Sequence, residues 1–397
     1  MKNTVAKSKK VHKAIAKHKN SKNNKVIYVF QGGGALGSFQ VGGVEALVEN
    51  SFVADMVVGI SIGGFNAAIV AGNPPEKRVE KLKEFWNTIT THIPFPNIPF
   101  HGMSKIHNFM GSQAALMFGQ KGFYKPKTKN PWLIQNGTPE EFCFYDTEPM
   151  RQTLQKVVDF DYINQKHVRL ILGATQLDTG EFVFFDSGKE TITIEHILAS
   201  GALPPGFPAS KIDDKYYVDG GVYANTPLSM VLDEFASNEN DVGHVLCFMF
   251  DLFSASGVLP HSMDGMLERI KDIQYSSHSK RPNARYATTQ NLSHAIRFIG
   301  DKLTDEQRND PEIKELLRLG NANSLDLVHV IYRSLKGTEL HSKDYNFSAE
   351  SAEIHYTQGY QQTKQLIIAE QESWKHKINN GSVIYTVNHG AVVEEEM

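Results

Sequence analysis

The stretch Asp55-Met56-Val57-Val58-Gly59-Ile60-Ser61-Ile62-Gly63-Gly64 decides the fold of this chain. Residues 56–60 form a short apolar run rich in β-branched side chains, which predicts a buried strand. Residues 65–71, Phe-Asn-Ala-Ala-Ile-Val-Ala, are mostly small or apolar, and they predict a helix. Between them, Gly59-x-Ser61-x-Gly63 matches the sharp strand-to-helix turn that exposes a nucleophilic serine at a sheet edge. The alternative interpretation is that Ser61 only caps the helix, so the neighbouring segments must distinguish the two.

The composition is that of an ordinary globular protein. The chain has 397 residues, of which 41% are hydrophobic and 21% charged, enough for one large domain or two. Cys143 and Cys247 lie in apolar runs and predict buried thiols in a reducing compartment. No apolar run is long enough to span a membrane, no Cys/His cluster has zinc spacing, and the basic start lacks the apolar core of a signal peptide. We therefore expect a cytoplasmic protein.

The start of the chain is strongly basic. The formal net charge is −3, and residues 1–25 contain nine lysines and no acid, so the remaining residues sum to −12. The simpler interpretation of residues 1–24 is a disordered, solvated tail. The alternative is a surface arm for anionic lipid or another polyanion, which would make the protein peripheral at membranes. We expect no nucleic acid partner.

A second glycine-rich segment precedes the serine motif. Residues 25–30 predict a strand that runs into Gly32-Gly33-Gly34-Ala35-Leu36-Gly37, followed by a helix over about 38–49. Glycines let the main chain approach a ligand closely, and N–H groups at a helix start bind anions. Gly32, Gly34 and Gly37 also match the dinucleotide motif, but that motif needs an acid at the end of the second strand. Asp55 precedes that strand, so nucleotide binding is the weaker interpretation.

The following residues predict alternating helices and strands. A charged amphipathic helix covers 75–90, and the proline-rich and aromatic segment 91–140 predicts irregular structure, either a cap over an active site or a loop packed down by its aromatic residues. Strands are predicted over 168–175, 181–185, 216–218 and 242–250, and helices over 194–199 and 227–235. The loop 200–208 is rigid and predicted to line the pocket. Asp219-Gly220-Gly221 ends one strand and places an acid at a sheet edge.

Beyond about residue 256 the character of the chain changes. Helices are predicted over 263–273, 293–303 and 348–374, and strands over 325–332 and near 383–387, before an acidic end. We therefore expect three parts: the tail 1–24, an α/β domain over 25–255, and a C-terminal extension over 256–397 packed on or beside it.

Four segments in this order resemble the patatin-like phospholipase family: 32–37, 59–63, 200–208 and 219–221. The resemblance covers about residues 25–255 and implies a three-layer α/β/α fold with a mostly parallel central sheet and no metal or other cofactor. It implies that Ser61 is the nucleophile, that Asp219 activates it, and that the N–H groups of Gly33, Gly34 and Ala35 form the oxyanion hole. The remaining motif glycines are Gly32, Gly37, Gly59, Gly63, Gly220 and Gly221. The extension looks like the mainly helical one carried by a bacterial subgroup of the family.

The residues predict the same chemistry independently of the family resemblance. Ester cleavage needs a nucleophile, a base within hydrogen-bond reach and donors for the developing oxyanion. A carboxylate is a weak base for a serine proton unless an apolar site raises its pKa, and Tyr216, Tyr217 and Val218 flank Asp219. We expect a serine acyl hydrolase that cleaves lipid or other carboxylic esters through a covalent acyl-enzyme.

Three alternatives stay open. Many members of the family have Arg or Lys where this chain has Leu36, which favours short hydroxyacyl esters or storage-polyester fragments as substrates. A catalytically weak membrane-surface protein that uses the basic tail is a second alternative. A histidine downstream of Asp219 would complete a triad in the chain order of α/β-hydrolases, and His261 is the one whose surroundings fit best.

Overall fold

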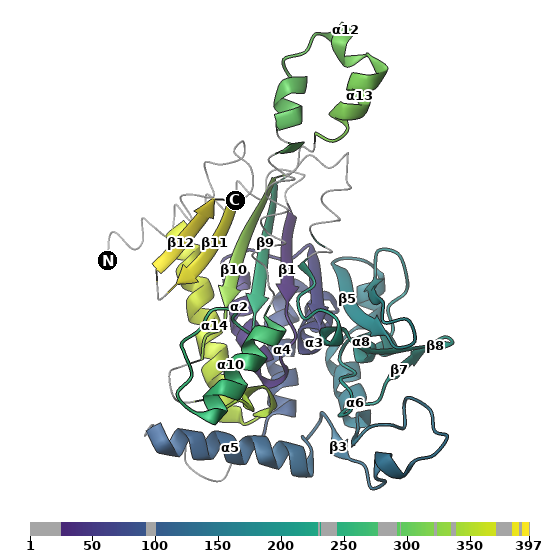
Figure 1. Cartoon of the computed structure of the whole chain (residues 1–397), viewed down its shortest axis with the longest axis vertical. Helices are drawn as coiled ribbons and strands as arrows, with labels where there is room; N and C mark the ends of the chain where they lie inside the picture. The colour runs from purple at the N-terminus through teal and green to yellow at the C-terminus, as the bar shows by residue number, and fades with distance from the viewer. Residues whose placement is uncertain are drawn as a thin grey trace.

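One mixed sheet runs through the molecule (Figure 1). The computed structural model describes residues 25–92, 101–228, 231, 244–276, 292–293, 295–320, 324–334, 339–370, 383–388 and 391–396. Ten strands pair in the order β12-β11-β10-β9-β1-β2-β5-β8-β7, with β6 paired to β5. The strands are β1 (Lys25–Phe30), β2 (Met56–Ile60), β5 (Arg169–Gln176), β6 (Phe182–Asp186), β7 (Ser210–Ile212), β8 (Lys215–Asp219), β9 (His244–Asp251), β10 (Ser324–Ile331), β11 (Val383–Asn388) and β12 (Ala391–Glu396).

The centre of the sheet is parallel, as the sequence predicts. The neighbours β11, β10, β9, β1, β2 and β5 all run in one direction. β12, β6, β8 and β7 pair antiparallel at or near the two edges. Parallel strands have their carboxyl ends at one edge of the sheet, so the loops after β1 and β2 lie together there.

Alternate residues of the central strands pack against opposite layers. Tyr28 and Phe30 belong to the larger apolar cluster, whereas Ile27 and Val29 belong to a smaller one that includes Leu228 and Val231. Helices cover the larger cluster, and this arrangement is the flanked α/β fold expected from the sequence. These helices are α2 (Ser38–Glu49), α3 (Ile62–Ala71), α4 (Pro75–Ile89) and α14 (Ala349–Glu370).

The C-terminal extension shares the sheet of the preceding domain. β10 pairs with β9 along eight residues, and β11 and β12 continue the sheet beyond it. Helix α14 lies so close to α2 that a Cβ at Gly42 would collide with the Tyr356 carbonyl oxygen, and one at Gly359 with the Phe39 carbonyl oxygen. The extension also carries α10 (Met263–Tyr275), α12 (Asp305–Arg308) and α13 (Pro311–Leu317).

The prediction of irregular structure over 91–140 is wrong in its middle. Residues 101–118 form the 18-residue helix α5 (His101–Phe118). Prolines flank this helix at 94, 96, 99, 126 and 131, and none falls inside it. After α5, β3 (Lys125–Pro126) pairs with β4 (Tyr145–Asp146). The prolines on both sides of the segment led to the prediction of irregular structure, although the residues between them contain no proline.

Several smaller predictions have clear outcomes. The helices α6 (Glu148–Val157) and α7 (Phe160–Asn164) were not predicted, whereas α8 (Ile194–Ser200) was. Both cysteines are buried and free, as expected.

The basic tail and nearly all of the helix predicted over 227–235 lie outside the described residues. Within the described residues, no helix is both long enough and apolar enough to cross a membrane.

Candidate active site

Ser61 occupies a strained turn between β2 and α3. Its φ and ψ angles are 56° and −130°, a conformation that few residues other than glycine adopt. A Cβ at Gly59 would collide with the Gly63 carbonyl oxygen, and one at Gly63 would lie 2.5 Å from the Phe30 carbonyl oxygen. The motif glycines are therefore required by close backbone packing around the serine.

Ser200, the last residue of α8, holds the strained turn in place. The Ser61 N–H donates to the Ser200 carbonyl oxygen at 2.9 Å. The Ser200 hydroxyl in turn donates to the Gly173 carbonyl oxygen of β5 at 2.8 Å. Ser200 thus ties the serine turn to the adjacent strand and fixes the position of Ser61 relative to it.

Asp219 ends β8 and is 1% exposed. Its Oδ1 accepts a hydrogen bond from the Gly221 N–H at 2.7 Å. Burial raises the pKa of Asp219 to about 6, although the Ser61 hydroxyl and the Gly221 N–H both favour the ionised form. Its Oδ2 is buried and has no hydrogen bond of ordinary geometry with a described residue, so the interaction with Ser61 is looser than a well-formed hydrogen bond. Loose contacts of this kind are common in active sites without substrate.

The first glycine loop lies directly beside Ser61. It connects β1 to the short helix η1 (Gly34–Gly37), and α2 follows. A Cβ at Gly32 would be 3.0 Å from the Ser61 Cβ, which shows how closely the loop passes the serine. Gly34 has a φ of 53° and opens η1, whose first N–H groups have no acceptor within the helix. The N–H groups of Gly33, Gly34 and Ala35 thus belong to a helix start next to Ser61, where negative charge is favoured.

Two residues that were not predicted at the site hold this loop. The Asn225 side chain donates to the Gly32 carbonyl oxygen at 3.0 Å, and the Asn225 carbonyl accepts from the Gly32 N–H at 3.3 Å. The Gln31 side chain accepts from Leu252 N–H at 2.6 Å and from Phe253 N–H at 3.0 Å. These bonds tie the loop to the end of β9 and to the segment after β8. The sequence signal is the polar Asn225-Thr226-Pro227 just after the acidic motif, a pattern that is also typical of a helix cap.

Leu36 does not face the reacting groups. Its side chain is fully buried in the larger apolar cluster. Leu36 is therefore part of the core.

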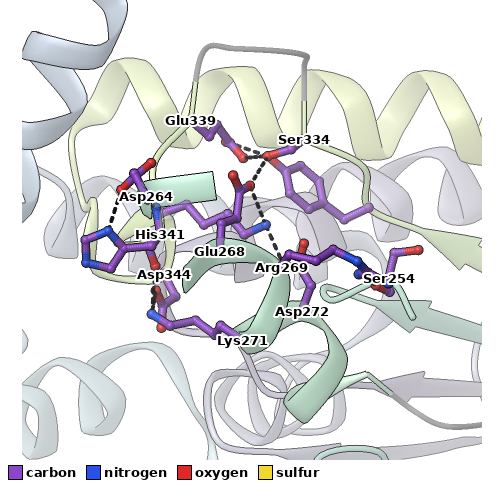
Figure 2. A network of polar contacts seen from close by, with 12 residues as sticks. Ser254, Asp264, Glu268, Arg269, Lys271, Asp272, Ser334, Glu339, His341 and Asp344 are labelled. Atoms are coloured by element: carbon purple, nitrogen blue, oxygen red, sulfur yellow. Dashed lines mark hydrogen bonds and ion pairs between the residues drawn. The ribbon is translucent and has the colours of Figure 1, made fainter. Parts of the chain in front are cut away.

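The extension also contacts the glycine loop. A short helix η4 (Lys343–Tyr345) packs on η1, and a Cβ at Gly34 would collide with the Asp344 carbonyl oxygen. Figure 2 shows the charged side chains of α10 gathered around this helix. Lys271 Nζ donates to Asp344 Oδ1 at 2.7 Å, and Lys343 Nζ donates to Asp272 at 2.8 Å and to Glu268 at 3.0 Å. Burial raises the pKa of Asp344 in spite of the Lys271 charge.

A second part of the network fixes the segment before η4. The Glu339 carboxylate accepts from His355 Nε2 of α14 at 2.7 Å and from the Tyr332 hydroxyl at 2.5 Å. Burial opposes ionisation of Glu339, but the hydrogen bond and charge of His355 lower its pKa to about 2. Ion pairs and hydrogen bonds within the extension thus hold α10, α14 and the segment before η4 around the element that packs on Gly34.

The loop 200–208 borders a cavity of about 380 Å³ that Gly201, Ala202 and Phe207 help to line. Its lining residues do not include Ser61 or Asp219, so we locate the site by the chemistry of these two residues rather than by this cavity. None of the hydrogen bonds described for Asp219 involves a histidine, and His261 lies exposed in the loop before α10. Among the described residues, no group of three or more His, Cys, Asp or Glu side chains could hold a metal ion.

Comparison with known proteins identifies the family. Residues 28–232 match the family model described as patatin-like phospholipase, and residues 273–380 match a second model described as patatin phospholipase. A putative patatin-like phospholipase domain-containing protein, M110.7 of Caenorhabditis elegans, is 33% identical over 91 residues, which are 22% of this chain. The aligned part spans 8% of that relative's length.

The crystal structure of VipD from Legionella pneumophila has 14% sequence identity, a TM-score of 0.34 and coverage of 88% of this chain and 67% of that one. The family models are the stronger finding, because the first of them alone covers more than half of the chain. The proteins of this family are ester hydrolases. On these matches, the chain belongs to the patatin-like phospholipase family.

Proposed function

We propose that this protein is a serine acyl hydrolase that cleaves lipid or other carboxylic esters with a Ser61–Asp219 dyad. The observation that carries the proposal is the environment of Asp219, whose burial raises its pKa to about 6 beside the Ser61 hydroxyl. A carboxylate with this pKa is a better proton acceptor than an ordinary one and is still ionised at neutral pH.

The proposed reaction has two halves. Ser61 Oγ attacks the ester carbonyl carbon while its proton passes to the Asp219 carboxylate, and the carbonyl oxygen becomes an oxyanion. The N–H groups of Gly33, Gly34 and Ala35 donate to that oxyanion, which the start of η1 also favours electrostatically. Collapse breaks the bond to the alcohol oxygen, which takes the proton from Asp219, and leaves an acyl group on Ser61. Water then attacks this ester, gives its proton to Asp219, and the acid product leaves as Ser61 recovers its proton.

A fluorophosphonate probe and a panel of p-nitrophenyl and phospholipid esters test the proposal. We expect the parent chain to be labelled and active, and Ser61→Ala to lose both properties while keeping its thermal transition. Loss of a nucleophile removes essentially all of the covalent catalysis. Ester hydrolysis by Ser61→Ala at the parental rate would refute the proposal. The same panel, extended to short hydroxyacyl esters, measures the substrate preference directly.

A further inference from the structure

Helix α5 presents its apolar side chains to the solvent. The residues that it buries against the protein include polar His107 and Ser112, and the Ser112 hydroxyl donates to the Ser342 carbonyl oxygen at 3.2 Å. The opposite stripe, spaced as one helix face, is mostly apolar, and its apolar side chains are between 37% and 65% exposed. Its apolar residues are Ile106, Phe109, Leu116 and Met117, and the partly exposed Gln113 lies between Phe109 and Leu116 on the same face.

Helix α10 also turns its charged residues toward the protein and its apolar residues toward the solvent. Its charged residues Glu268, Lys271 and Asp272 point toward η4, as Figure 2 shows, and none of its residues is buried. Its apolar residues fall on the other side and are between 45% and 75% exposed. They are Met263, Met266, Leu267, Ile270 and Ile273.

Both helices lie at the active-site end of the molecule. Figure 1 shows α5 and α10 beyond the ends toward which β9 and β10 point, whereas α12 and α13 project from the opposite end. Both helices contact η4 or the residue before it, α5 through Ser112 and α10 through Lys271, and η4 packs on Gly34 of the glycine loop. Exposed apolar side chains that gather on one face of a helix, rather than lying singly, mark an interaction site.

The charge of the segment that contains α5 indicates what covers its outward face. Residues 85–139 contain five lysines and no Asp or Glu. Lys121 and Lys129 are exposed, and Trp132 is 84% exposed, while Lys125 pairs with Asp146 at 3.2 Å. Exposed lysines beside apolar and aromatic side chains complement a bilayer with anionic headgroups, because the lysines contact phosphates and the apolar residues enter the acyl boundary.

We propose that the outward faces of α5 and α10 form a docking surface that lays the active-site end of this protein on an anionic lipid bilayer. Docking requires neither Ser61 nor Asp219, so it can be measured independently of the proposed hydrolase activity. Ester substrates in the membrane would then reach the serine without crossing water.

Vesicle flotation of the full chain carrying Ser61→Ala tests the proposal, because this variant cannot alter the lipid by hydrolysis. The vesicles contain phosphatidylcholine alone or mixed with phosphatidylglycerol. The test variants are Phe109→Ser with Met117→Ser on α5, and Met266→Ser with Ile270→Ser on α10. The matched control is Leu316→Ser with Ile368→Ser, whose parent side chains are 59% and 61% exposed on α13 and α14. Thermal transitions confirm that each variant is folded.

We expect each test pair to weaken binding to the mixed vesicles by about tenfold, and the control pair to leave it unchanged. Lys121→Gln should weaken binding to the mixed vesicles by about fivefold and leave any binding to phosphatidylcholine alone unaffected. Equal binding by parent and test variants would overturn the proposal. So would equal losses in the test and control pairs, or a change from dimer to monomer in light scattering with vesicle binding intact, which would identify a second copy as the occupant.

Discussion

Ser61 and Asp219 lie on opposite sides of the same residue of β5, Ala174. Ile60 pairs with Gly173, so Ser61 follows at the level of Ala174, and Ala174 pairs with Asp219 from the other side. The two side chains thus meet although β2 and β8 run in opposite directions relative to β5. β5 extends past the end of β2, and this extra length allows an antiparallel strand to end at the edge where Ser61 lies.

The first prediction concerns the base. Asp219→Asn should lower kcat on a soluble ester by at least about 10²-fold, because the amide cannot accept the Ser61 proton. The control is His261→Ala, since His261 is exposed in a loop and should not take part in proton transfer. A severe loss in His261→Ala together with a mild loss in Asp219→Asn would replace the dyad by a triad. In the parent, the rate should fall as the pH drops below the Asp219 pKa of about 6.

The second prediction concerns stability and pH. The pKa of Asp219 is raised from 3.8 to about 6 in the folded protein, so the folded state binds this proton more tightly than the unfolded state does. The corresponding stability is present at low pH and is lost as the pH rises through about 6. Asp219→Asn should therefore raise the free energy of unfolding at about pH 8 by up to about 3 kcal/mol, and much less at about pH 4. Urea unfolding at both pH values measures the difference. If the gain in free energy of unfolding is equal at the two pH values, or larger at the lower one, ionisation of Asp219 does not destabilise the folded protein.

The third prediction uses the strain at the nucleophile. Ser61 has a positive φ of 56°, which costs free energy for any residue with a Cβ. Ser61→Gly should consequently be more stable than Ser61→Ala by about 1 kcal/mol, although both lack the hydroxyl. Calorimetry of the two variants tests this, and a more stable alanine variant would mean that the turn relaxes around the substitution.

The fourth prediction concerns the contact between the glycine loop and the extension. Gly34→Ala should reduce ester hydrolysis strongly, because its Cβ would collide with the Asp344 carbonyl oxygen and displace either the loop or η4. Gly180→Ala is the matched control. Gly180 also has a positive φ, of 71°, but a Cβ added there would have nothing within 4 Å. Both variants should lose about 1 kcal/mol from backbone strain, and only Gly34→Ala should lose activity. Full activity in Gly34→Ala would mean that the loop does not need its observed position.

The fifth prediction concerns the basic start of the chain. If residues 1–24 contact an anionic surface, Lys7→Gln, Lys9→Gln and Lys10→Gln together should weaken binding of the full chain to vesicles with phosphatidylglycerol. The loss should be larger at low salt, because screening already weakens the parent at high salt. Hydrolysis of a soluble ester should stay unchanged. Equal vesicle binding by parent and variant at low salt would leave the solvated tail as the better interpretation.

Local sequence determined most of the fold around the site. Strand β1, the glycine loop and helix α2 occur where the pattern places them, as do β2, the serine turn and α3. These segments could be predicted because their signals are local. Apolar runs form buried strands, and glycines mark the places where two backbone segments pack closely. The chemistry proposed for Ser61 and Asp219 followed from the same local patterns.

Only the tertiary structure decided how distant segments meet. The register of β5 brings Ser61 and Asp219 together, and Asn225 and Gln31 hold the glycine loop through bonds to residues far along the chain. The extension joins the sheet and places Asp344 against Gly34, which no local pattern records because the contact joins residues some 300 positions apart. The outward apolar faces of α5 and α10 also needed the structure. Periodicity shows that a helix has two faces, but only packing decides which of them the protein buries.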